Sequence, residues 1–198
     1  MSDQSGGQDG RGYHHGDLRR ALLDAAESLM AEGTDDPSLR AVARRAGVSH
    51  AAPYKHFADR HALRAAVAER GFAALGQAMQ ESAETAHRDE RMRAIGRAYV
   101  AFALARPARY RLMFGPEFAQ GRGTPELDRA ARTAFDALAA TQGRGDAPAG
   151  DRTTAVAYWS LVHGLATLLI DGRVAVPEGT DPLDFAQQVL GSLRAGSR

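Results

Sequence analysis

Residues 38–57 read SLRAVARRAGVSHAAPYKHF, and this stretch decides the expected fold. Serine often caps helix N-termini, so Ser38 and Ser49 each mark the start of a helix. Gly47 lies between them, and glycine readily adopts the positive φ that a tight turn requires. The pattern predicts a short helix after Ser38, a turn at Gly47 and a second helix from Ser49 through Phe57. Two short helices joined by such a turn form a helix-turn-helix unit.

The side chains of this stretch divide into an inner and an outer face. Ala43 is small where the two helices meet, and Leu39, Val42 and Val48 supply apolar contacts inside the unit. The second helix then points residues outward, and its first turn can reach base edges in a DNA major groove. The hydroxyl groups of the two capping serines suit phosphate oxygens. The outward-facing candidates are Ser38, Ser49, His50, Ala51, Tyr54, Lys55 and His56.

The positive charge of the chain is concentrated in the same segment. The 198 residues carry a net charge of +1, which hides an uneven distribution. Three basic and eight acidic residues give 1–37 a net charge of −5, whereas six basic and one acidic residue give 38–64 a net charge of +5. A local positive field suits a polyanion, so Arg40 joins the DNA-binding candidates. The six basic residues are Arg40, Arg44, Arg45, Lys55, Arg60 and Arg64.

Pro53 is the exceptional residue of the unit. It is the fourth residue after Ser49 and lacks the N–H that an α-helix would use there. We expect its ring to pack on the preceding helices in place of an aliphatic side chain. The alternative interpretation of the stretch is a helical hairpin with a solvated basic face, which the charge alone does not refute. The spacing that favours the helix-turn-helix unit is that of Ala43, Gly47, Val48, Tyr54 and Phe57.

Helical periodicity, interrupted by Gly and Pro, extends over the rest of the chain. The sequence therefore predicts an all-α fold of about nine helices. The first runs from about Leu18 to Glu32 with Asp17 as its N-cap, and the polar residues 1–12 before it are expected to be disordered. The other helices are expected at about 38–46, 49–57, 59–86, 89–105, 108–114, 124–141, 151–171 and 181–194.

The composition argues against several classes of protein. Zero cysteines exclude disulfides, thiolate metal sites and cysteine nucleophiles. The N-terminus lacks the apolar core of a signal peptide, and the apolar stretch 155–170 is shorter than a membrane span. We therefore expect a cytoplasmic protein with no membrane partner. His14 and His15 are adjacent, but no third ligand at a defined spacing accompanies them, so neither a metal nor a cofactor is expected.

Residues 13–67 resemble the DNA-binding domain of TetR/AcrR-type transcriptional regulators. The resemblance rests on GDLRRALLDAAESLMAEG and SLRAVARRAGVSHAAPYKHFADRHALRAAV, including a Gly-Val-Ser turn and a Tyr-x-His-Phe pattern. It implies a homodimer whose recognition helices occupy successive major grooves of a palindromic operator. It also implies that Tyr54 and His56 contact phosphates and that Arg60 anchors the next helix on the DNA backbone. Pro53 stands where the family most often has an aliphatic residue.

Two C-terminal segments look like the Trp–His–Gly (WHG) type of C-terminal domain in this family. They are FALARPARYRLMFGPEF at 102–118 and WSLVHGLATLL at 159–169. The resemblance implies an effector-binding domain, and ligand pockets are mainly apolar with a few polar groups. Ordinary core packing is the alternative for each aromatic residue, and a hydrogen-bonded structural pair is the alternative for Trp159 with His163. The candidate pocket residues are Phe102, Tyr110, Met113, Phe114, Phe135, Trp159 and His163.

The helix that contains Trp159 is apolar almost all round, so we expect it to be buried on more than one side. One side would face its own domain and another a symmetry mate, in a four-helix bundle with the last helix. Gly164 lies in mid-helix, which the close approach of another helix would explain. The candidate interface residues are Leu165, Leu168, Leu183, Ala186, Leu190 and Leu193.

Together these features predict a dimeric repressor that an unidentified small molecule releases from double-stranded DNA. The expected division is a tail at 1–12, a helix-turn-helix domain at 13–60 and a helical effector-binding and dimerisation domain at 61–198. Three alternatives stay open. One is an enzyme, although no Ser/His/Asp spacing, metal motif or phosphate loop supports it. The others are an effector-independent architectural or activating DNA-binding protein, and an interaction module that has lost DNA binding.

Overall fold

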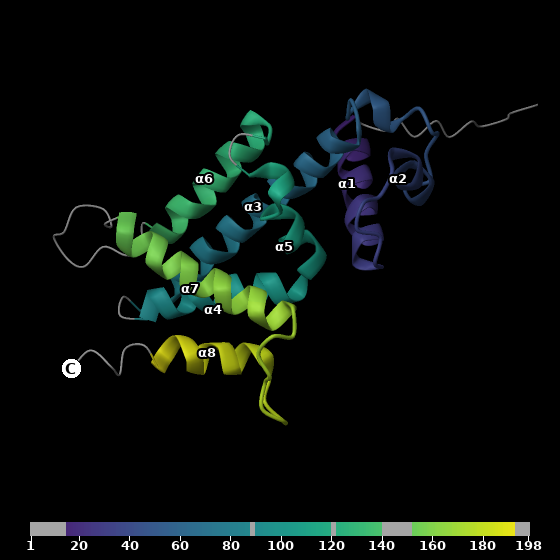
Figure 1. Ribbon diagram of the computed structural model, residues 1–198. Coiled ribbons are helices and arrows are strands. Elements are labelled where there is room, and N and C mark those ends of the chain that lie inside the picture. The colour runs from purple at the N-terminus through teal and green to yellow at the C-terminus, as the bar shows by residue number, and fades with distance from the viewer. Residues whose placement is uncertain (1–14, 88–89, 120–121, 140–151, 193–198) are drawn as a thin grey trace, which may run out of the picture.

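The computed structural model describes residues 15–87, 90–119, 122–139 and 152–192, and all its regular elements are helices (Figure 1). The predicted all-α fold is thus confirmed, with eight α-helices and two short 3-10 turns in the described part of the chain. The elements are α1 (His15–Ala31), α2 (Leu39–Arg45), η1 (Pro53–Lys55), α3 (Arg60–Thr85), α4 (Arg91–Ala105), α5 (Pro107–Met113), η3 (Pro116–Phe118), α6 (Pro125–Ala139), α7 (Arg152–Ile170) and α8 (Pro182–Ser192). The predicted disordered tail at 1–12 lies outside the described residues.

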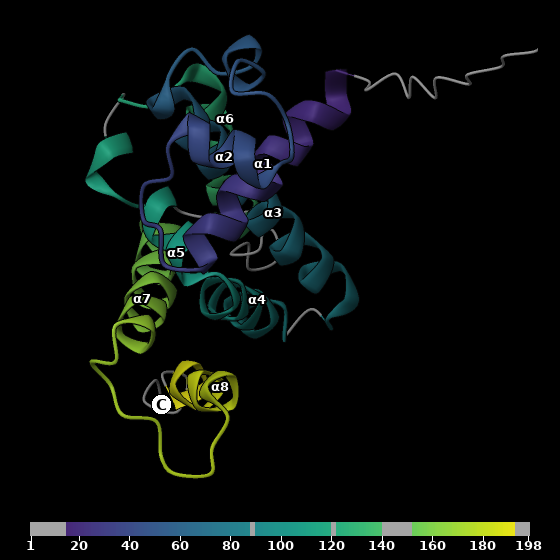
Figure 2. The same ribbon diagram turned by 90° about the vertical axis from the view of Figure 1, so that its right-hand side faces the viewer.

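The long helix α3 joins the two ends of the molecule. Figure 1 shows α1 and α2 at one end of α3, and the larger group of helices along the rest of it. In that group α3 packs against α4, α5 and α6, while α7 packs on α4 and α6 and α8 packs on α4 (Figure 2). One continuous apolar core extends from Leu22 of α1 through Val67 of α3 to Leu190 of α8.

Capping side chains set several of the predicted helix boundaries. The Ser38 hydroxyl accepts a hydrogen bond from the Ala41 N–H at 3.2 Å, and the Asp59 carboxylate accepts one from Ala62 at 2.8 Å. Gly47 adopts a φ of 69°, as the predicted turn requires. The first helix differs from the prediction, because it begins at His15 and so places Asp17 inside its first turn.

The predicted second helix of the unit, Ser49 through Phe57, is wrong. Only residues 53–55 form a regular element there, the 3-10 turn η1. Pro53 has no N–H to donate to the Ser49 carbonyl, which instead accepts from the Ala52 N–H at 3.0 Å. The shorter bonding pattern continues as Lys55 donates to the carbonyl of Ala52 at 3.3 Å. The expected packing of Pro53 is confirmed, since the ring is buried and η1 contacts α2.

An exposed ion pair holds α2 against the end of α1. The Arg45 guanidinium donates to both carboxylate oxygens of Glu32, each at 2.5 Å, and to the Ser28 hydroxyl at 2.6 Å. Hydrogen bonds from Arg45 and Ser28 lower the pKa of Glu32 from 4.5 to about 2. A two-pronged contact of this kind restricts both partners and fixes the angle between α1 and α2.

Replacing Glu32 with glutamine should therefore change how stability depends on pH. The folded state holds the pKa of Glu32 below its unfolded value, so the ionised carboxylate stabilises the fold above pH 4.5. That contribution is lost as the pH falls from 4.5 toward 2. We expect Glu32→Gln to lower the unfolding free energy at pH 6 and to flatten its pH dependence in this window, measured by urea unfolding with circular dichroism. Equal pH slopes for the variant and the wild type would contradict the account, and Glu126→Gln, at an exposed position of α6, is the matched control.

Candidate nucleic-acid interface and ligand pocket

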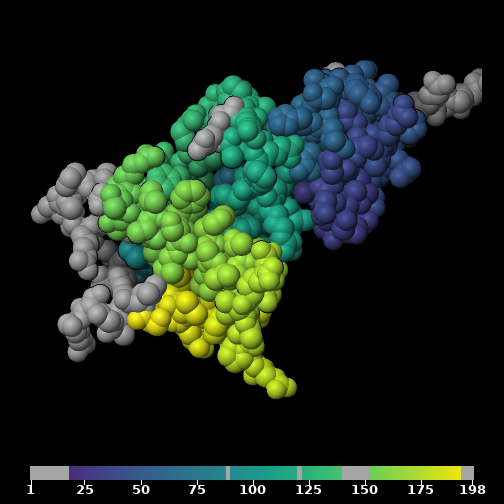
Figure 3. All heavy atoms as spheres, viewed as in Figure 1, coloured from purple at the N-terminus to yellow at the C-terminus, as the bar shows by residue number. Residues whose placement is uncertain are grey.

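Most of the predicted DNA-binding residues are exposed and lie in or beside α2 and η1. This end of the molecule appears in purple and blue in Figure 3. Tyr54 is 55% exposed, which is unusual for a large aromatic side chain in the folded chain. His56 is half-buried beside the Phe57 ring, at 6.4 Å between ring centroids. The exposed candidates are Ser38, Arg40, Ser49, His50, Ala51, Tyr54, Lys55 and Arg60.

The six basic residues of the segment divide into two groups. Arg45 is paired with Glu32, Arg60 with Asp36 at 2.6 Å, and Arg64 with Asp36 at 3.3 Å and Glu117 at 2.6 Å. The acidic stretch before the unit therefore neutralises part of the basic stretch that follows it. Within the described residues, Arg40, Arg44 and Lys55 form no ion pair. The positive field predicted from the sequence is consequently narrower in the fold, and Arg60 has an acidic partner in the protein itself.

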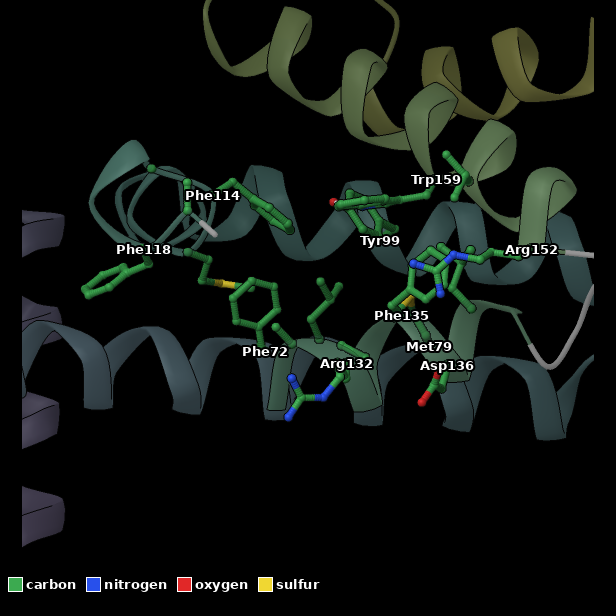
Figure 4. Close-up of a pocket in the computed structure, with 18 residues that line it drawn as sticks. Phe72, Met79, Tyr99, Phe114, Phe118, Arg132, Phe135, Asp136, Arg152 and Trp159 are labelled. Atoms are coloured by element: carbon green, nitrogen blue, oxygen red, sulfur yellow. The ribbon is translucent and has the colours of Figure 1, made fainter. Parts of the chain in front are cut away.

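A cavity of about 550 Å³ lies between α3, α4, α6, α7 and the α5–η3 segment (Figure 4). Four of the seven candidate pocket residues line it, namely Met113, Phe114, Phe135 and Trp159. Phe102, Tyr110 and His163 do not line this cavity. Sequence reasoning missed its α3 wall, because α3 reads as an ordinary amphipathic helix, and it missed two arginines. The missed lining residues include Phe72, Leu75, Met79, Arg132 and Arg152.

A chain of hydrogen bonds runs from the cavity into the core behind it. Trp159 Nε1 donates to the Tyr99 hydroxyl at 3.3 Å, and the Tyr99 and Tyr110 hydroxyls lie 3.3 Å apart. Both hydroxyls reach His163 Nδ1, at 3.0 Å from Tyr99 and 2.7 Å from Tyr110. Burial raises the pKa of both tyrosines and lowers the pKa of His163, so neutral forms are favoured throughout. Trp159 thus faces the cavity, while His163 belongs to the core.

The α5–η3 segment contacts the DNA-binding end through two sets of ion pairs. In the first, Arg109 of α5 pairs with Glu27 of α1, and their side chains are only 10% and 14% exposed. Burial lowers the pKa of Arg109, although the Glu27 charge opposes this effect. Arg70 of α3 extends the set, at 2.5 Å from Asp24 and 3.8 Å from Glu27.

The second set joins η3 to α3 and to the loop before α2. Glu117 accepts hydrogen bonds from Arg64 Nε at 2.8 Å and from Arg64 Nη2 at 2.6 Å, and it lies 3.2 Å from His61 Nδ1. Burial raises the pKa of Glu117, but the hydrogen bonds and charges of Arg64 and His61 together lower it by more. The pKa of Glu117 therefore lies below its usual value. Arg64 also donates to the Asp35 carbonyl at 2.8 Å. Phe118, the next residue after Glu117, lines the cavity.

A glycine allows α5 to lie close to α3. A Cβ atom at Gly71 would stand 2.5 Å from the Met113 sulfur and 3.2 Å from Arg109 Cδ. Met113 lines the cavity, and Arg109, four residues earlier in α5, pairs with Glu27. The close contact of α3 with α5 at Gly71 therefore involves both the cavity wall and the ion pair.

The predicted dimer residues fall into three groups. Leu165, Ala186 and Leu190 are buried within the protomer, so a partner would not reach them. Leu168 is 43% exposed and Leu183 is half-buried, whereas Leu193 lies outside the described residues. A Cβ atom at Gly164 would meet nothing within 4 Å among the described residues, so no helix described in the protomer explains that glycine.

Helix α7 is apolar enough and, at 19 residues, long enough to cross a membrane by these two criteria alone. In the fold it packs against α4 and α6, and its buried residues are Ala155, Val162, Leu165 and Ala166. The predicted absence of a membrane partner stays a prediction. The adjacent histidines considered as metal ligands are not both described, since His14 lies outside the described residues.

Two family models match the chain. Residues 22–67 match the bacterial regulatory proteins of the tetR family, and residues 92–193 match a tetracyclin repressor-like C-terminal domain. The second match includes both segments with WHG-type resemblance, at 102–118 and 159–169. A comparison with curated proteins finds no match.

Solved structures with the same architecture come from several bacteria. A protein of unknown function from Rhodococcus sp. RHA1 is 37% identical, with 94% of this chain and 98% of that chain covered and a TM-score of 0.75. The TetR family transcriptional regulator PfmR from Thermus thermophilus is 19% identical, with 89% and 98% covered and a TM-score of 0.63. The transcriptional regulator FadR from Bacillus subtilis, in complex with stearoyl-CoA, is 14% identical, with 90% and 99% covered and a TM-score of 0.66.

The two family models together cover the helix-turn-helix unit, part of α3 and the described helices from α4 to α8. The chain therefore belongs to the TetR family of bacterial transcriptional regulators, with a helix-turn-helix DNA-binding domain at its N-terminal end.

Proposed function

We propose that this protein is a homodimeric transcriptional repressor that leaves a palindromic operator when a small molecule fills the cavity. One observation carries the proposal: the α5–η3 segment is at once a wall of the cavity and the partner of the DNA-binding end. Met113, Phe114 and Phe118 face the cavity, while Arg109 and Glu117 hold α1 and α3. A ligand that displaces this wall would bias the position of the DNA-binding unit.

The DNA-binding surface would work mainly through phosphate contacts. Arg40, Arg44 and Lys55 are the basic side chains of the segment 38–64 that form no ion pair with the described residues, and we assign them to phosphates. His50 and Ala51 stand first in the recognition segment, where base edges would be within reach. Tyr54 and His56 take further phosphates, and the family resemblance supports these two assignments. Since the segment ends in a 3-10 turn, the surface for base contacts is short.

The exposed apolar side of α7 would form the centre of the dimer. Leu168 is 43% exposed, and Gly164, one turn before it, has open space on its free side. We assign this exposed side to the partner subunit, since contiguous exposed apolar surface is typical of interaction sites. The two-fold symmetry would then place two recognition segments on successive major grooves, about 34–36 Å apart.

The cavity favours a ligand-responsive regulator over an effector-independent one. Its volume of about 550 Å³ lies within the range of small-molecule sites, roughly 300–1,000 Å³. FadR, which shares this fold, is seen in complex with stearoyl-CoA, which supports a ligand-responsive regulator. Membership of a family of DNA-binding regulators likewise favours a cytoplasmic regulator over an enzyme.

The three arginines of α2 provide a matched test of the DNA-binding surface. Arg40→Ala and Arg44→Ala should each weaken operator binding and reduce the slope of log affinity against log salt by about 0.9, the value for one phosphate contact. Arg45→Ala should instead lower stability and leave the slope unchanged, because Arg45 is paired with Glu32. Fluorescence anisotropy between 50 and 200 mM salt, roughly the range in which such slopes are measured, provides the measurement.

The operator fragment for this titration is first isolated from genomic DNA. A Tyr54→Ala/Lys55→Ala double variant should also bind that fragment more weakly. Operator binding by this double variant as tight as that of the wild type would show that the DNA-binding surface lies elsewhere. So would a reduced slope of log affinity against log salt in Arg45→Ala but not in Arg40→Ala or Arg44→Ala.

Leu168→Glu should convert the dimer to a folded monomer. The substitution places a charge on the exposed apolar side of α7, where burial against a partner would leave it desolvated and unpaired. Gly164→Leu should also weaken the dimer, although the protomer has room for the side chain. Analytical ultracentrifugation gives the mass, and circular dichroism confirms the fold. Ala73→Glu, at an exposed position of α3, is the control and should leave the dimer intact. If Leu168→Glu and Gly164→Leu also leave the dimer intact, the interface lies elsewhere.

A further inference from the structure

The structure points to an amphipathic anion as the ligand of the cavity. We propose that an apolar body fills the interior and that a negatively charged head group, a carboxylate or a phosphate, is bound by the exposed arginines of the lining, Arg132 and Arg152. This inference rests on the proposed effector role of the cavity and specifies the chemistry of its ligand.

The interior of the cavity offers almost no free polar group. Its buried walls come from Phe72, Leu75 and Met79 of α3 and from Met113 and Phe118 of the α5–η3 segment. A ligand part placed there exchanges water for apolar contacts, which favours hydrocarbon or aromatic groups. A charged group at the same depth would lose its hydration without gaining a partner.

The polar groups of Trp159 and Tyr99 in the cavity wall are already engaged. Trp159 Nε1 donates to the Tyr99 hydroxyl, and that hydroxyl lies within hydrogen-bond distance of Tyr110 and His163. A ligand that bonded to Trp159 or Tyr99 would have to break one of these contacts. These groups therefore offer a ligand no free partner, so a charged head group can pair only with the exposed charged residues of the lining.

The mouth carries an excess of positive charge. The charged residues that line the cavity are Arg132, Asp136 and Arg152, and all three are exposed. Neither arginine forms an ion pair within the described residues. The Arg152 guanidinium lies 5.8 Å from the centre of the Phe135 ring, and Figure 4 shows it reaching over that ring beside the cavity. A cation held in this way at the edge of an apolar site suits a carboxylate or phosphate.

Charge at the mouth and apolarity inside together disfavour two simpler ligands. A neutral hydrocarbon would gain nothing from the two arginines, and a cationic amphiphile would be repelled by them. The volume of about 550 Å³ accommodates a body the size of a medium or long acyl chain or a fused aromatic ring. A free acid and an acyl ester of a larger phosphate carrier share the required chemistry.

Three probes with the same tail test the inference directly. Dodecanoate, dodecanol and dodecyltrimethylammonium carry an anionic, a neutral and a cationic head, and each is used below its micelle concentration. Trp159 is the single tryptophan of the chain and lines the cavity, so its fluorescence reports binding. Dodecanoate should bind most tightly, dodecanol more weakly and the cation weakest. Dodecanoyl-coenzyme A, added as a fourth probe, distinguishes a free acid from a carrier-bound acyl group.

Variants of the mouth separate the head group from the tail. Arg132→Gln and Arg152→Gln should each weaken dodecanoate binding, by roughly three- to tenfold for an exposed charge contact, and leave dodecanol unchanged. Arg129→Gln is the matched control, because Arg129 is exposed on the same helix but does not line the cavity. Equal affinity for dodecanoate and dodecanol, or a preference for dodecanoate that survives the Arg132→Gln/Arg152→Gln double variant, would overturn the inference.

The same experiment distinguishes this inference from the proposed function. If dodecanoate binds with the expected charge preference but leaves the operator complex intact, the ligand class stands and effector release fails. If a neutral or cationic compound fills the cavity and releases the operator, the regulatory role stands and the anionic head group is wrong.

Discussion

Ion pairs tie residues 107–118, which form one wall of the cavity, to the DNA-binding end of the molecule. Arg109 forms an ion pair with Glu27 that is largely shielded from water, and breaking such a pair by removing one partner typically costs about 3–5 kcal/mol. Because both partners must stay together, α5 and α1 are expected to move as one unit. Glu117 repeats the arrangement at η3, where Arg64 and His61 converge on it. The cavity and the DNA-binding end therefore share one short segment.

The uneven charge distribution of the chain contributes ion pairs that hold the helix-turn-helix unit together. The acidic stretch at 1–37 and the basic stretch at 38–64 have opposite net charges, and ion pairs join their described residues in the fold. Glu32 and Asp36 neutralise Arg45 and Arg60, which leaves Arg40, Arg44 and Lys55 without acidic partners among the described residues. In the proposed DNA complex, these three cations would keep the contact local, so that a modest change in the position of the unit would weaken it.

Local signals in the sequence predicted the fold well where capping and turn chemistry decide the structure. Ser38 and Asp59 cap helices, and Gly47 adopts its positive φ, because each residue acts on its immediate neighbours. The recognition segment was mispredicted for an equally local reason. The missing N–H of Pro53 converts the expected helix into a 3-10 turn, and periodicity alone does not register that loss.

The candidate site was predicted only in part, because its residues meet through tertiary packing. Met113, Phe114, Phe135 and Trp159 were recognised as large apolar groups near a WHG-type pattern, whereas the α3 wall around Phe72 and Met79 carries no sequence signal of its own. The Arg109–Glu27 and Arg64–Glu117 pairs join residues far apart in the chain. Such pairs are set by the angle between helices, which single-sequence reasoning does not provide.

The central claim is that the cavity and the DNA-binding end are coupled through the α5–η3 segment. Coupling is reciprocal, so operator binding must alter the cavity as surely as a ligand alters operator binding. The most direct measurement is a titration of the protein with operator DNA that follows Trp159 emission and, in parallel, anisotropy of labelled DNA. The account predicts an emission change that saturates with the anisotropy and that is reduced in Glu117→Gln. Full operator binding with no change in Trp159 emission would contradict it.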